Sequence, residues 1–344
     1  MRDRVDLSVI IPMYNEEENV VEAVRHVVQA LAPFPGEWEI VLVNDGSSDG
    51  TLAVARHVAA TDKRVRVTSY AHNRGRGKAL RTGFATARGE YIVSIDADLS
   101  YDPKYILDLV RVLEEEEDVD IVVGSPYMPG GGTEAVPRGR LWVSRVGNWI
   151  LSLAMGGNIK TITCIFRAYR RRVLESLDLE SDGKEIHLEI LSKALASGYR
   201  VKEVPAILRS RRRGKSKFRF RATAFSHIVF TFFERPLLLF GMVGILLITL
   251  GLIGGVYIIY LWQQKALNPE RPLMTLLVLL ILTGVQILSF GFIGTQLVGL
   301  RKEIYKLEAA ERRQGKVLAN IVAGNSSSVI TPEDPIENKA EQGG

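Results

Sequence analysis

Two carboxylates stand at the end of a predicted buried strand, within the stretch "SIDADLS". The apolar run 91–95 predicts the strand, and Asp96 and Asp98 follow it. Two like charges this close repel each other and are costly to bury without a positive partner. A divalent cation, Mg²⁺ or Mn²⁺, is the simplest partner, because such ions bind carboxylate oxygens together with the phosphate oxygens of a substrate. The alternative, that the pair only caps the next helix, is weaker because Asp102 before Pro103 already suits that role.

Strand and helix signals alternate around this stretch and place it in a larger fold. Strands are predicted from apolar runs at 7–11, 39–43, 65–70, 91–95 and 120–124. Helices are predicted from the periodicity at 15–31, 52–60, 78–87 and 103–117. This alternation is typical of an α/β fold with a mostly parallel, Rossmann-like sheet. A loop at 126–137 and a helix at 141–155 follow, and further elements continue to about residue 208.

Polar residues follow four of the predicted strands. They occupy the segments 12–16, 44–47, 73–78 and 96–98. In a parallel sheet the carboxyl ends of the strands lie along one edge, which is where α/β proteins bind ligands. We therefore expect the four segments to form one site.

Two long apolar runs predict membrane-spanning helices. Leu237–Trp262 has 26 residues without a charge, and Pro272–Leu300 has 29. At 1.5 Å per residue, each run exceeds the roughly 30 Å hydrocarbon core of a bilayer. The alternative, two buried helices of a soluble protein, fits poorly because the runs are too long and too uniformly apolar. We expect transmembrane helices at about 237–262 and 273–300.

Flanking charges predict the orientation of these helices. Arginines at 219, 221 and 235 precede the first helix, and Arg301, Lys302 and Lys306 follow the second, whereas the connection 263–271 has only two cations. The positive-inside rule then predicts a multi-pass protein of the cell membrane with its N-terminal α/β domain and both termini in the cytoplasm. The first apolar run is too short for a signal peptide, and the single Cys164 excludes an intrachain disulfide, as in a reducing compartment.

A strongly basic strip precedes the first membrane helix. Arg209–Arg221 carries eight Lys or Arg and no acid. The whole chain has a net charge of +5, so the residues outside this strip are together mildly acidic. Such a strip can bind nucleic acid, but its position beside a membrane helix favours lipid phosphates instead. We expect membrane lipids as partners and no nucleic acid.

The ordered motifs resemble those of family 2 glycosyltransferases, which have a GT-A fold. "VIIPMYNEEENV" and "VLVNDGSSDGT" are similar to the family's nucleotide-sugar motifs, and "SIDADLS" to its metal-binding Asp-x-Asp segment. The resemblance covers roughly residues 7–215. Within the family, "DADLSYDPKYI", "GSPYMPGGG" and "RGKSKF" most resemble dolichyl- or polyprenyl-phosphate sugar synthases of the dolichyl-phosphate mannose synthase type.

The resemblance implies a donor site on the first four strand ends. Pro12, Tyr14 and Glu16 match the nucleoside pocket, and Asp45 matches a residue that holds the base or ribose. The metal ligands that bridge to the donor diphosphate would be Asp96 and Asp98. An ordinary turn role for Pro12 and Tyr14 remains open.

The resemblance also implies an acceptor site made of cations. Arg140 and Ser144 match positions that grip the acceptor phosphate, and Arg213 and Lys217 match cations near the two phosphate groups. A solvated helix face remains an alternative for Arg140 and Ser144.

Three departures from the family pattern fall at positions expected to bind the metal, the sugar or the acceptor. Pro126 stands where the family commonly has Arg, and Ser100 stands where a Gln often serves as a third metal ligand. Cys164, Ile165 and Phe166 replace a Ser-Gly-Phe segment.

The activity implied by the resemblance is inverting transfer of a hexose from a GDP- or UDP-linked sugar to dolichyl or polyprenyl phosphate. Two alternatives remain: a glycosyltransferase with another lipid or a polysaccharide as acceptor, and a non-enzymatic membrane scaffold. The expected parts are a glycosyltransferase domain at 1–208, a basic juxtamembrane segment at 209–235, two membrane helices within 236–301 and a tail at 302–344, disordered from about 315. Gly251 and Gly255 form a Gly-x-x-x-Gly pattern that suggests association with another copy.

Overall fold

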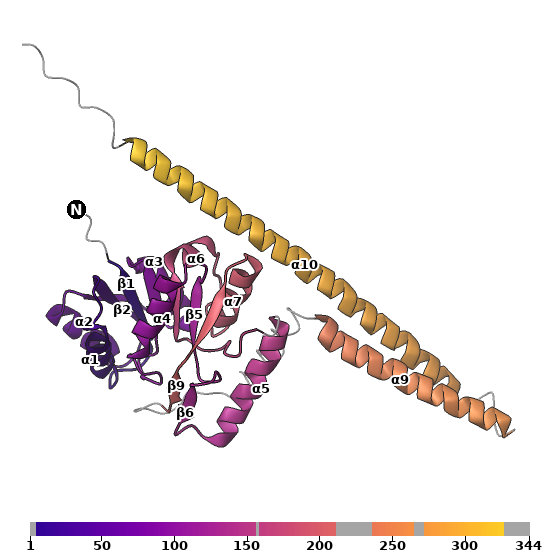
Figure 1. The fold of residues 1–344 in the computed structure, drawn as a ribbon. Coiled ribbons are helices and arrows are strands. Elements are labelled where there is room, and N and C mark those ends of the chain that lie inside the picture. The colour runs from indigo at the N-terminus through magenta and orange to yellow at the C-terminus, as the bar shows by residue number, and fades with distance from the viewer. Residues whose placement is uncertain (1–4, 156–157, 211–235, 265–271, 327–344) are drawn as a thin grey trace, which may run out of the picture.

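The computed structural model describes residues 5–155, 158–210, 236–264 and 272–326. These residues form an α/β domain and a long helical hairpin that projects from one side of it (Figure 1). Arg213 and Lys217, the two basic-strip residues assigned to the acceptor, lie outside the described residues.

The α/β domain is built on a seven-stranded sheet with the order β3-β2-β1-β4-β7-β5-β8. Its strands are β1 (Leu7–Met13), β2 (Trp38–Asp45), β3 (Val65–Tyr70), β4 (Tyr91–Ser94), β5 (Ile121–Ser125), β7 (Arg167–Arg170) and β8 (Val201–Pro205). All neighbouring pairs are parallel except those that β7 makes with β4 and β5. The prediction of a mostly parallel α/β sheet is confirmed.

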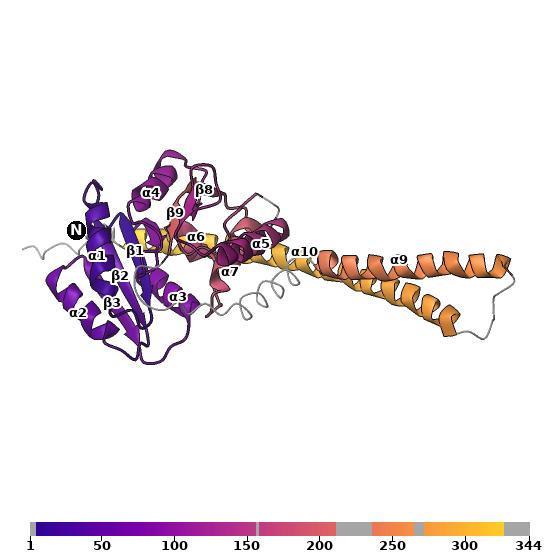
Figure 2. The same cartoon turned by 90° about the horizontal axis from the view of Figure 1, so that it is seen from below.

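Helices cover both faces of this sheet (Figures 1 and 2). They are α1 (Val20–Leu31), α2 (Thr51–Thr61), α3 (Arg76–Thr86), α4 (Tyr105–Glu115), α5 (Arg138–Ala154), α6 (Arg171–Ser176) and α7 (Ile186–Ala196). α1 contacts α4, and α3 contacts α7. In α1 the buried side chains recur every three or four residues, at Val20, Ala23, Val24, Val27 and Leu31, so one stripe of the helix joins the core.

The predicted strands and helices of the first 125 residues are present, with shifted ends. The helix expected at 15–31 begins only at Val20. Asn15 has a φ of 52°, and the N–H of Asn19 donates to the carbonyl of Glu16, so this segment is a turn. Asn side chains tolerate the left-handed conformation and form hydrogen bonds with the backbone of turns, so a polar segment of this kind can form a turn instead of a helix.

The order of the strands defines a switch point between β1 and β4. After β1 the chain moves outward through β2 and β3, then α3 returns it to β4 on the opposite side of β1. The N–H of Ile95 still donates to the carbonyl of Ile10, at 3.1 Å, before the two chains part. Ligands of doubly wound sheets bind in the crevice at such a point, which here lies directly ahead of Asp96.

A two-stranded sheet supports the segment that follows β4. It pairs β6 (Gly132–Glu134) with β9 (Ile207–Arg209). The N–H of Arg209 donates to the carbonyl of Ser100 at 2.8 Å, and Tyr101 forms a β-bridge with Leu208. The basic strip therefore begins beside the Asp-x-Asp segment.

The hairpin consists of α9 (Pro236–Gln263) and α10 (Pro272–Ser326), two helices long and apolar enough to cross a membrane. They approach closely where Gly244 faces Gly284, because a Cβ on either glycine would press against the backbone of the other helix. Gly251 also faces α10, whereas a Cβ added to Gly255 would have no described atom within 4 Å. Gly251 is thus used inside the hairpin rather than for a second copy, and self-association remains a prediction.

α10 continues well past the apolar run. The tail was expected to be disordered from about residue 315, but the helix extends to Ser326. The sequence after Leu300 is rich in Leu, Glu, Lys, Arg and Ala, which are strong helix formers, and it includes ion pairs such as Lys306 with Glu303 at 2.8 Å. This extension contacts α6 and α7 of the α/β domain.

Candidate active site at the carboxyl ends of β1 to β4

Asp45, at the end of β2, holds the segment that follows β3. Its buried carboxylate accepts hydrogen bonds from the Tyr70 hydroxyl at 2.7 Å and the Asn73 amide at 2.8 Å. The backbone N–H groups of Arg74 and Gly75 also donate to it, at 2.8 and 3.0 Å. The residue assigned to the nucleotide is therefore also the anchor of the neighbouring loop, which it holds against the site.

Hydrogen bonds also join the ends of β1 and β2. The N–H of Asn15 donates to the Ser47 hydroxyl at 3.0 Å, and the N–H of Ser48 donates to the Asn15 side chain at 2.9 Å. The N–H of Glu16 donates to the Thr51 hydroxyl at 2.9 Å. These bonds order the segment that carries Pro12, Tyr14 and Glu16, and they leave the Tyr14 ring exposed to solvent.

Asp96 has a positive partner within the chain. Nη2 of Arg76, in the first turn of α3, lies 3.1 Å from Oδ1 of Asp96. The Asp96 side chain is 20% exposed and that of Arg76 is 36% exposed, so the pair faces an open site. This contact connects the ends of β3 and β4, and with the bonds above it brings the four predicted segments together.

Asp98 belongs to a tight turn next to Asp96. Its Oδ1 accepts the N–H of Ser100 at 3.0 Å, and Leu99 between them has a φ of 53°, in the left-handed region. Leu99 is held there although a β-carbon disfavours this conformation. The turn fixes where the Asp98 carboxylate points.

The carboxylates fit a divalent cation. Asp96 and Asp98 offer hard oxygen ligands in a partly exposed position. Among the described residues no group of three or more His, Cys, Asp or Glu side chains is arranged to hold a metal. A cation here would take its remaining ligands from the donor diphosphate and from water, as Mg²⁺ commonly does.

A loop at 178–183 packs on the start of α3, which carries Arg76. The carbonyl of Asp182 accepts the N–H groups of Gly77 and Lys78 at 2.7 and 3.2 Å, and its carboxylate pairs with Arg81 and with Arg74. Gly75, with a φ of 99°, and Gly77 are required because a Cβ on either would overlap the backbone of this loop.

Glu189 of α7 holds the same loop from the other side. Its carboxylate accepts the N–H groups of Glu180 and Ser181 at 2.9 and 2.8 Å and pairs with Lys193 at 2.8 Å. Burial pushes the pKa of Glu189 up, but the hydrogen bonds from Lys193 and the loop outweigh burial and lower it. Glu189 is thus ionised and structural.

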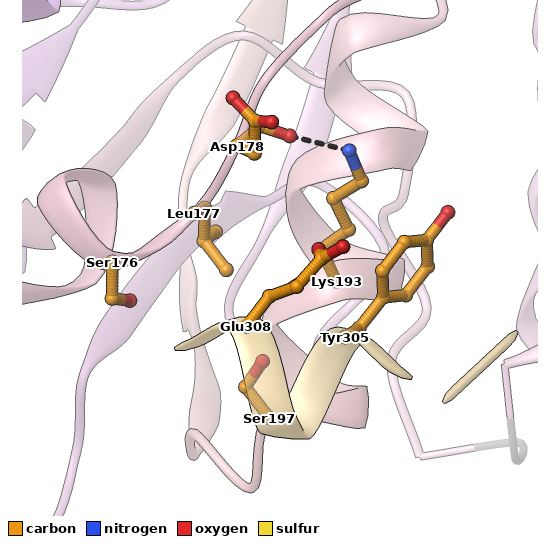
Figure 3. A pocket seen from close by; sticks show the side chains of 7 residues that line it. All are labelled: Ser176, Leu177, Asp178, Lys193, Ser197, Tyr305 and Glu308. Atoms are coloured by element: carbon orange, nitrogen blue, oxygen red, sulfur yellow. Dashed lines mark hydrogen bonds between the residues drawn. The ribbon is translucent and has the colours of Figure 1, made fainter. Parts of the chain in front are cut away.

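The extension of α10 covers Lys193. Lys193 donates to the carbonyl of Asp178, and the Tyr305 ring lies 5.1 Å from its ammonium group (Figure 3). The Asp178 carboxylate pairs with Arg312 of α10 at 2.9 Å. The helix that leaves the hairpin therefore contacts the loop that supports α3.

The acceptor residues are only partly described. Ser144 lies on α5, where its hydroxyl accepts from the Tyr127 hydroxyl at 2.8 Å. Arg140 lies on the first turn of the same helix. Tyr127 follows Pro126, so Ser144 lies beside the position at which this chain lacks the arginine that the resemblance led us to expect. Arg209, the first residue of the basic strip, pairs with Asp102 at 3.1 Å beside the Asp-x-Asp turn.

Two buried groups near the site are inert. Burial, together with the positive charges of Arg167 and Arg76, lowers the pKa of His187 well below its usual value, so its imidazole is neutral. Burial raises the pKa of Cys164 to about 11, so its thiol stays protonated. Neither suits the role of a base or nucleophile in contact with substrate.

Sequence reasoning did not single out Arg76 or Asp182. The signal for Arg76 was the run "NRGRGKALR", in which cations alternate with glycines at the start of a predicted helix. The signal for Asp182 was weaker, an acidic turn in "ESDGKE".

Residues 8–178 match the protein family described as "Glycosyl transferase family 2". Dodecaprenyl-phosphate galacturonate synthase of Rhizobium johnstonii is 29% identical over 306 residues, which is 84% of this chain and 87% of that protein. Polyprenol monophosphomannose synthase of Mycolicibacterium smegmatis is 37% identical over 217 residues, 61% of this chain and 79% of that protein. Glycosyltransferase AglD of Haloferax volcanii is 34% identical over 205 residues, 58% of this chain and 32% of that protein.

Solved structures share the fold of the α/β domain. Glucosyl-3-phosphoglycerate synthase of Mycobacterium tuberculosis, in complex with phosphoglyceric acid, superposes with a TM-score of 0.52 at 23% identity, over 66% of this chain and 79% of that one. Its complex with Mn²⁺, uridine-diphosphate-glucose and phosphoglyceric acid gives a TM-score of 0.51 at 20% identity, over the same shares of the two chains.

Proposed function

This chain belongs to glycosyltransferase family 2, and from that premise we propose that it transfers a hexose from a nucleotide sugar to a polyprenyl phosphate at a membrane. The product would be a lipid-phosphate-linked sugar for glycan assembly. The chain is an enzyme of the glycosyltransferase class.

The names of two relatives support the identity of the proposed acceptor more strongly than the identity of the transferred sugar. A dodecaprenyl-phosphate galacturonate synthase and a polyprenol monophosphomannose synthase have a polyprenyl phosphate in common and differ in the sugar. The match to the first of these relatives covers 84% of this chain, so it includes residues beyond the α/β domain. A polyprenyl phosphate is therefore the proposed acceptor, while mannose and galacturonate are both candidates for the sugar.

The observation that carries the proposal is the cluster of polar residues at the carboxyl ends of β1 to β4, around the switch point between β1 and β4. Asp96 and Asp98 lie there, and the segments after β1, β2 and β3 are fixed around them by hydrogen bonds. A solved structure of the same fold contains Mn²⁺ together with a uridine-diphosphate sugar. We assign Asp96 and Asp98 to a divalent metal, Mg²⁺ or Mn²⁺, and Pro12, Tyr14, Glu16 and Asp45 to the nucleotide.

The chemistry requires little of the protein beyond positioning and charge. An acceptor phosphate oxygen attacks the anomeric carbon with inversion, and the bond from that carbon to the nucleoside diphosphate breaks. A phosphate monoester has a second pKa of about 6, so it is already ionised and needs no base. A bound divalent metal would supply charge stabilisation for the leaving diphosphate.

Cations of this chain would hold the two phosphate groups together. We assign this role to Arg140, Arg213 and Lys217, with Ser144 as a hydrogen-bonding partner of the acceptor. Charge-assisted hydrogen bonds from such groups are strongest where water is excluded. The α9–α10 hairpin would cross the membrane with both termini in the cytoplasm, which brings the basic strip to the level of the lipid headgroups.

A panel assay tests the proposal. The purified full-length protein is incubated with polyprenyl phosphate, Mn²⁺ and one radiolabelled GDP- or UDP-linked sugar at a time, and label is measured in the lipid phase. One sugar should be transferred, and chelation of the metal should abolish transfer. A chain that binds nucleotide sugars but labels no lipid with any donor would contradict the proposal.

A further inference from the structure

The part of α10 that follows the apolar run lies along the α/β domain. We call these residues, 301–326, the α10 extension; they contact α6 and α7 (Figure 1). Tyr305, Glu308 and Arg312 are three and four residues apart, so they lie on one side of the helix. This side faces the domain, whereas Leu307 on another side is 69% exposed. The extension therefore has one side that packs on the domain.

Two contacts join this side to the residues between α6 and the end of α7. The Tyr305 ring lies 5.1 Å from the ammonium group of Lys193, which donates to the carbonyl of Asp178 (Figure 3). The guanidinium of Arg312 lies 2.9 Å from the Asp178 carboxylate. The cavity left between the two surfaces measures only about 10 Å³, at the lower limit of the space that one water molecule needs. The α10 extension is thus in close contact with the domain here.

The group that Tyr305 covers is part of a buried ion pair. The side chains of Lys193 and Glu189 are each 11% exposed and lie 2.8 Å apart. Glu189 also accepts the N–H groups of Glu180 and Ser181, at 2.9 and 2.8 Å. A desolvated pair of this kind is stable only while its geometry and its hydrogen bonds are kept. The Tyr305 ring therefore protects the contacts that fix the loop at its base.

The same loop fixes the first turn of α3. The carbonyl of Asp182 accepts the N–H of Gly77 at 2.7 Å, and a Cβ on Gly75 would lie only 2.5 Å from that carbonyl oxygen. Arg76 stands between the two glycines, and its guanidinium lies 3.1 Å from Asp96. The loop and the backbone of Arg76 are therefore in direct contact, and a loop that loosens would release the residue that meets the metal-binding segment.

We propose that the α10 extension positions the proposed donor site at the carboxyl ends of β1 to β4, through Tyr305 and Arg312. These two positioning residues hold the loop at 178–183, and the loop holds Arg76. The family match ends at residue 178, so this control comes from a part of the chain beyond it. The effect on nucleotide binding rests on the proposed function, whereas the effect on the order of the loop does not.

Hydrogen exchange of the full-length protein in nanodiscs tests the effect on the loop. In a double variant, Tyr305→Ala with Arg312→Gln, amides of the segment 74–82 should exchange about three- to tenfold faster, as expected for loss of a cation–π contact and a partly exposed ion pair. Exchange in β2 should stay unchanged. Lys306→Gln is the matched control, because Lys306 is exposed on the same helix and pairs with Glu303 of that helix. Equal exchange of 74–82 in the double variant and the wild type would overturn the proposal.

Nucleotide binding separates positioning from a general loosening of the domain. UDP and GDP are titrated in turn, each with Mn²⁺, and the one that the wild type binds more tightly is used. The double variant should bind it about three- to tenfold more weakly. Tyr305→Phe, which keeps the ring, should bind as the wild type does, and the KM for polyprenyl phosphate should not change in any variant.

The outcomes distinguish this proposal from the proposed function. A wild type that binds neither nucleotide would contradict the proposed function, and the exchange experiment would still decide whether the α10 extension orders the loop. An unchanged nucleotide affinity in the double variant would overturn the proposal. A loss of affinity that Lys306→Gln shares would overturn it as well.

Discussion

The guanidinium of Arg76 lies 3.1 Å from the carboxylate of Asp96, so the acid expected to bind a metal has a cation of its own. The two residues come from different strand ends, and both side chains are partly exposed. A partly exposed pair that opens to solvent is worth about 1 kcal/mol, and a divalent ion can displace it. We expect Arg76 to hold Asp96 in place until donor and metal arrive, and then to be free to pair with the diphosphate.

Replacing Arg76 by Gln should separate these two roles. Without the competing cation, the protein alone should bind Mn²⁺ about two- to fivefold more tightly, as expected for the loss of a pair worth up to about 1 kcal/mol. Binding can be measured by electron paramagnetic resonance of free Mn²⁺. Arg76→Lys, which keeps the charge, is the control and should bind Mn²⁺ as the wild type does. Weaker Mn²⁺ binding by Arg76→Gln would show that Arg76 does not compete for Asp96.

Asp98→Asn should lower the rate of sugar transfer by about 100-fold or more, the usual cost of removing one charge-stabilising group from an active site. The fold should survive, because an Asn side-chain oxygen can still accept the N–H of Ser100. Asp102→Asn is the matched control, since it removes an acid from the same segment that pairs with the partly exposed Arg209. Its rate should stay within about fivefold of the wild type. Equal losses in the two variants would argue against a special role for Asp98.

Gly77→Ala should destabilise the protein by about 1–3 kcal/mol, because the added methyl group would overlap the carbonyl of Ser181 in the loop on α3. Gly139→Ala on α5 adds a methyl group that has no described atom within 4 Å, and it should be neutral or stabilising by up to about 1 kcal/mol. Thermal unfolding of the two variants checks this difference. A Gly77→Ala protein as stable as the wild type would mean that the loop does not pack on α3 as described.

Stability should fall below pH 6.5 because of His187. Its pKa in the folded chain lies well below the unfolded value of about 6.5, through burial and the charges of Arg167, Arg76 and Lys184. The unfolded chain therefore binds an extra proton below that pH, which costs about 1 kcal/mol of stability between pH 6.5 and 5.5.

The change His187→Phe isolates this effect. Among the described residues neither ring nitrogen of His187 has a hydrogen-bond partner, so the replacement removes no side-chain hydrogen bond from this part of the core. The variant should show a flatter melting temperature between pH 7 and 5.5 than the wild type. Replacement of the exposed His57 by Gln should leave the slope unchanged. A slope that persists in His187→Phe would place its origin elsewhere.

The strands β1, β2, β4 and β5 were predictable because they are buried along nearly their whole length and therefore read as apolar runs. The strands β3 and β8 are only partly buried and mix polar with apolar residues. The positions of Asp45, Asp96 and Asp98 at the edge of the sheet followed from the parallel arrangement alone. The partner of Asp96 did not follow, because Arg74, Arg76, Lys78 and Arg81 are crowded in one segment and only the packing of α3 on the loop at 178–183 selects Arg76.

Other features depend on tertiary contacts that periodicity cannot report. Trp142, Trp149 and Leu153 of α5 recur at helical spacing, which ordinarily places such residues in the core, whereas here they are exposed. The polar residues after 315 resemble a disordered tail in composition, yet α10 continues through them to Ser326.

The proposed function depends most on the nucleophile being a phosphate oxygen of the lipid and not an alcohol oxygen. Transfer to an alcohol would need a base beside the hydroxyl, and such a base is typically worth about 10²–10⁴ in rate. In the part of the chain that the structure describes, His187 is buried and neutral, and Glu189 is bound to Lys193 and the loop at 178–183. Asp96 and Asp98 are assigned to the metal. A phosphate acceptor avoids this need because it is already ionised.

The direct test offers the purified protein a matched pair of acceptors, polyprenyl phosphate and the corresponding polyprenol, with the same labelled nucleotide sugar and Mn²⁺. The initial rate of label transfer into the lipid phase is compared at pH 7.5. Our account predicts transfer to the phosphate and a rate with the alcohol lower by about 100-fold or more. Comparable rates with the two acceptors would contradict it.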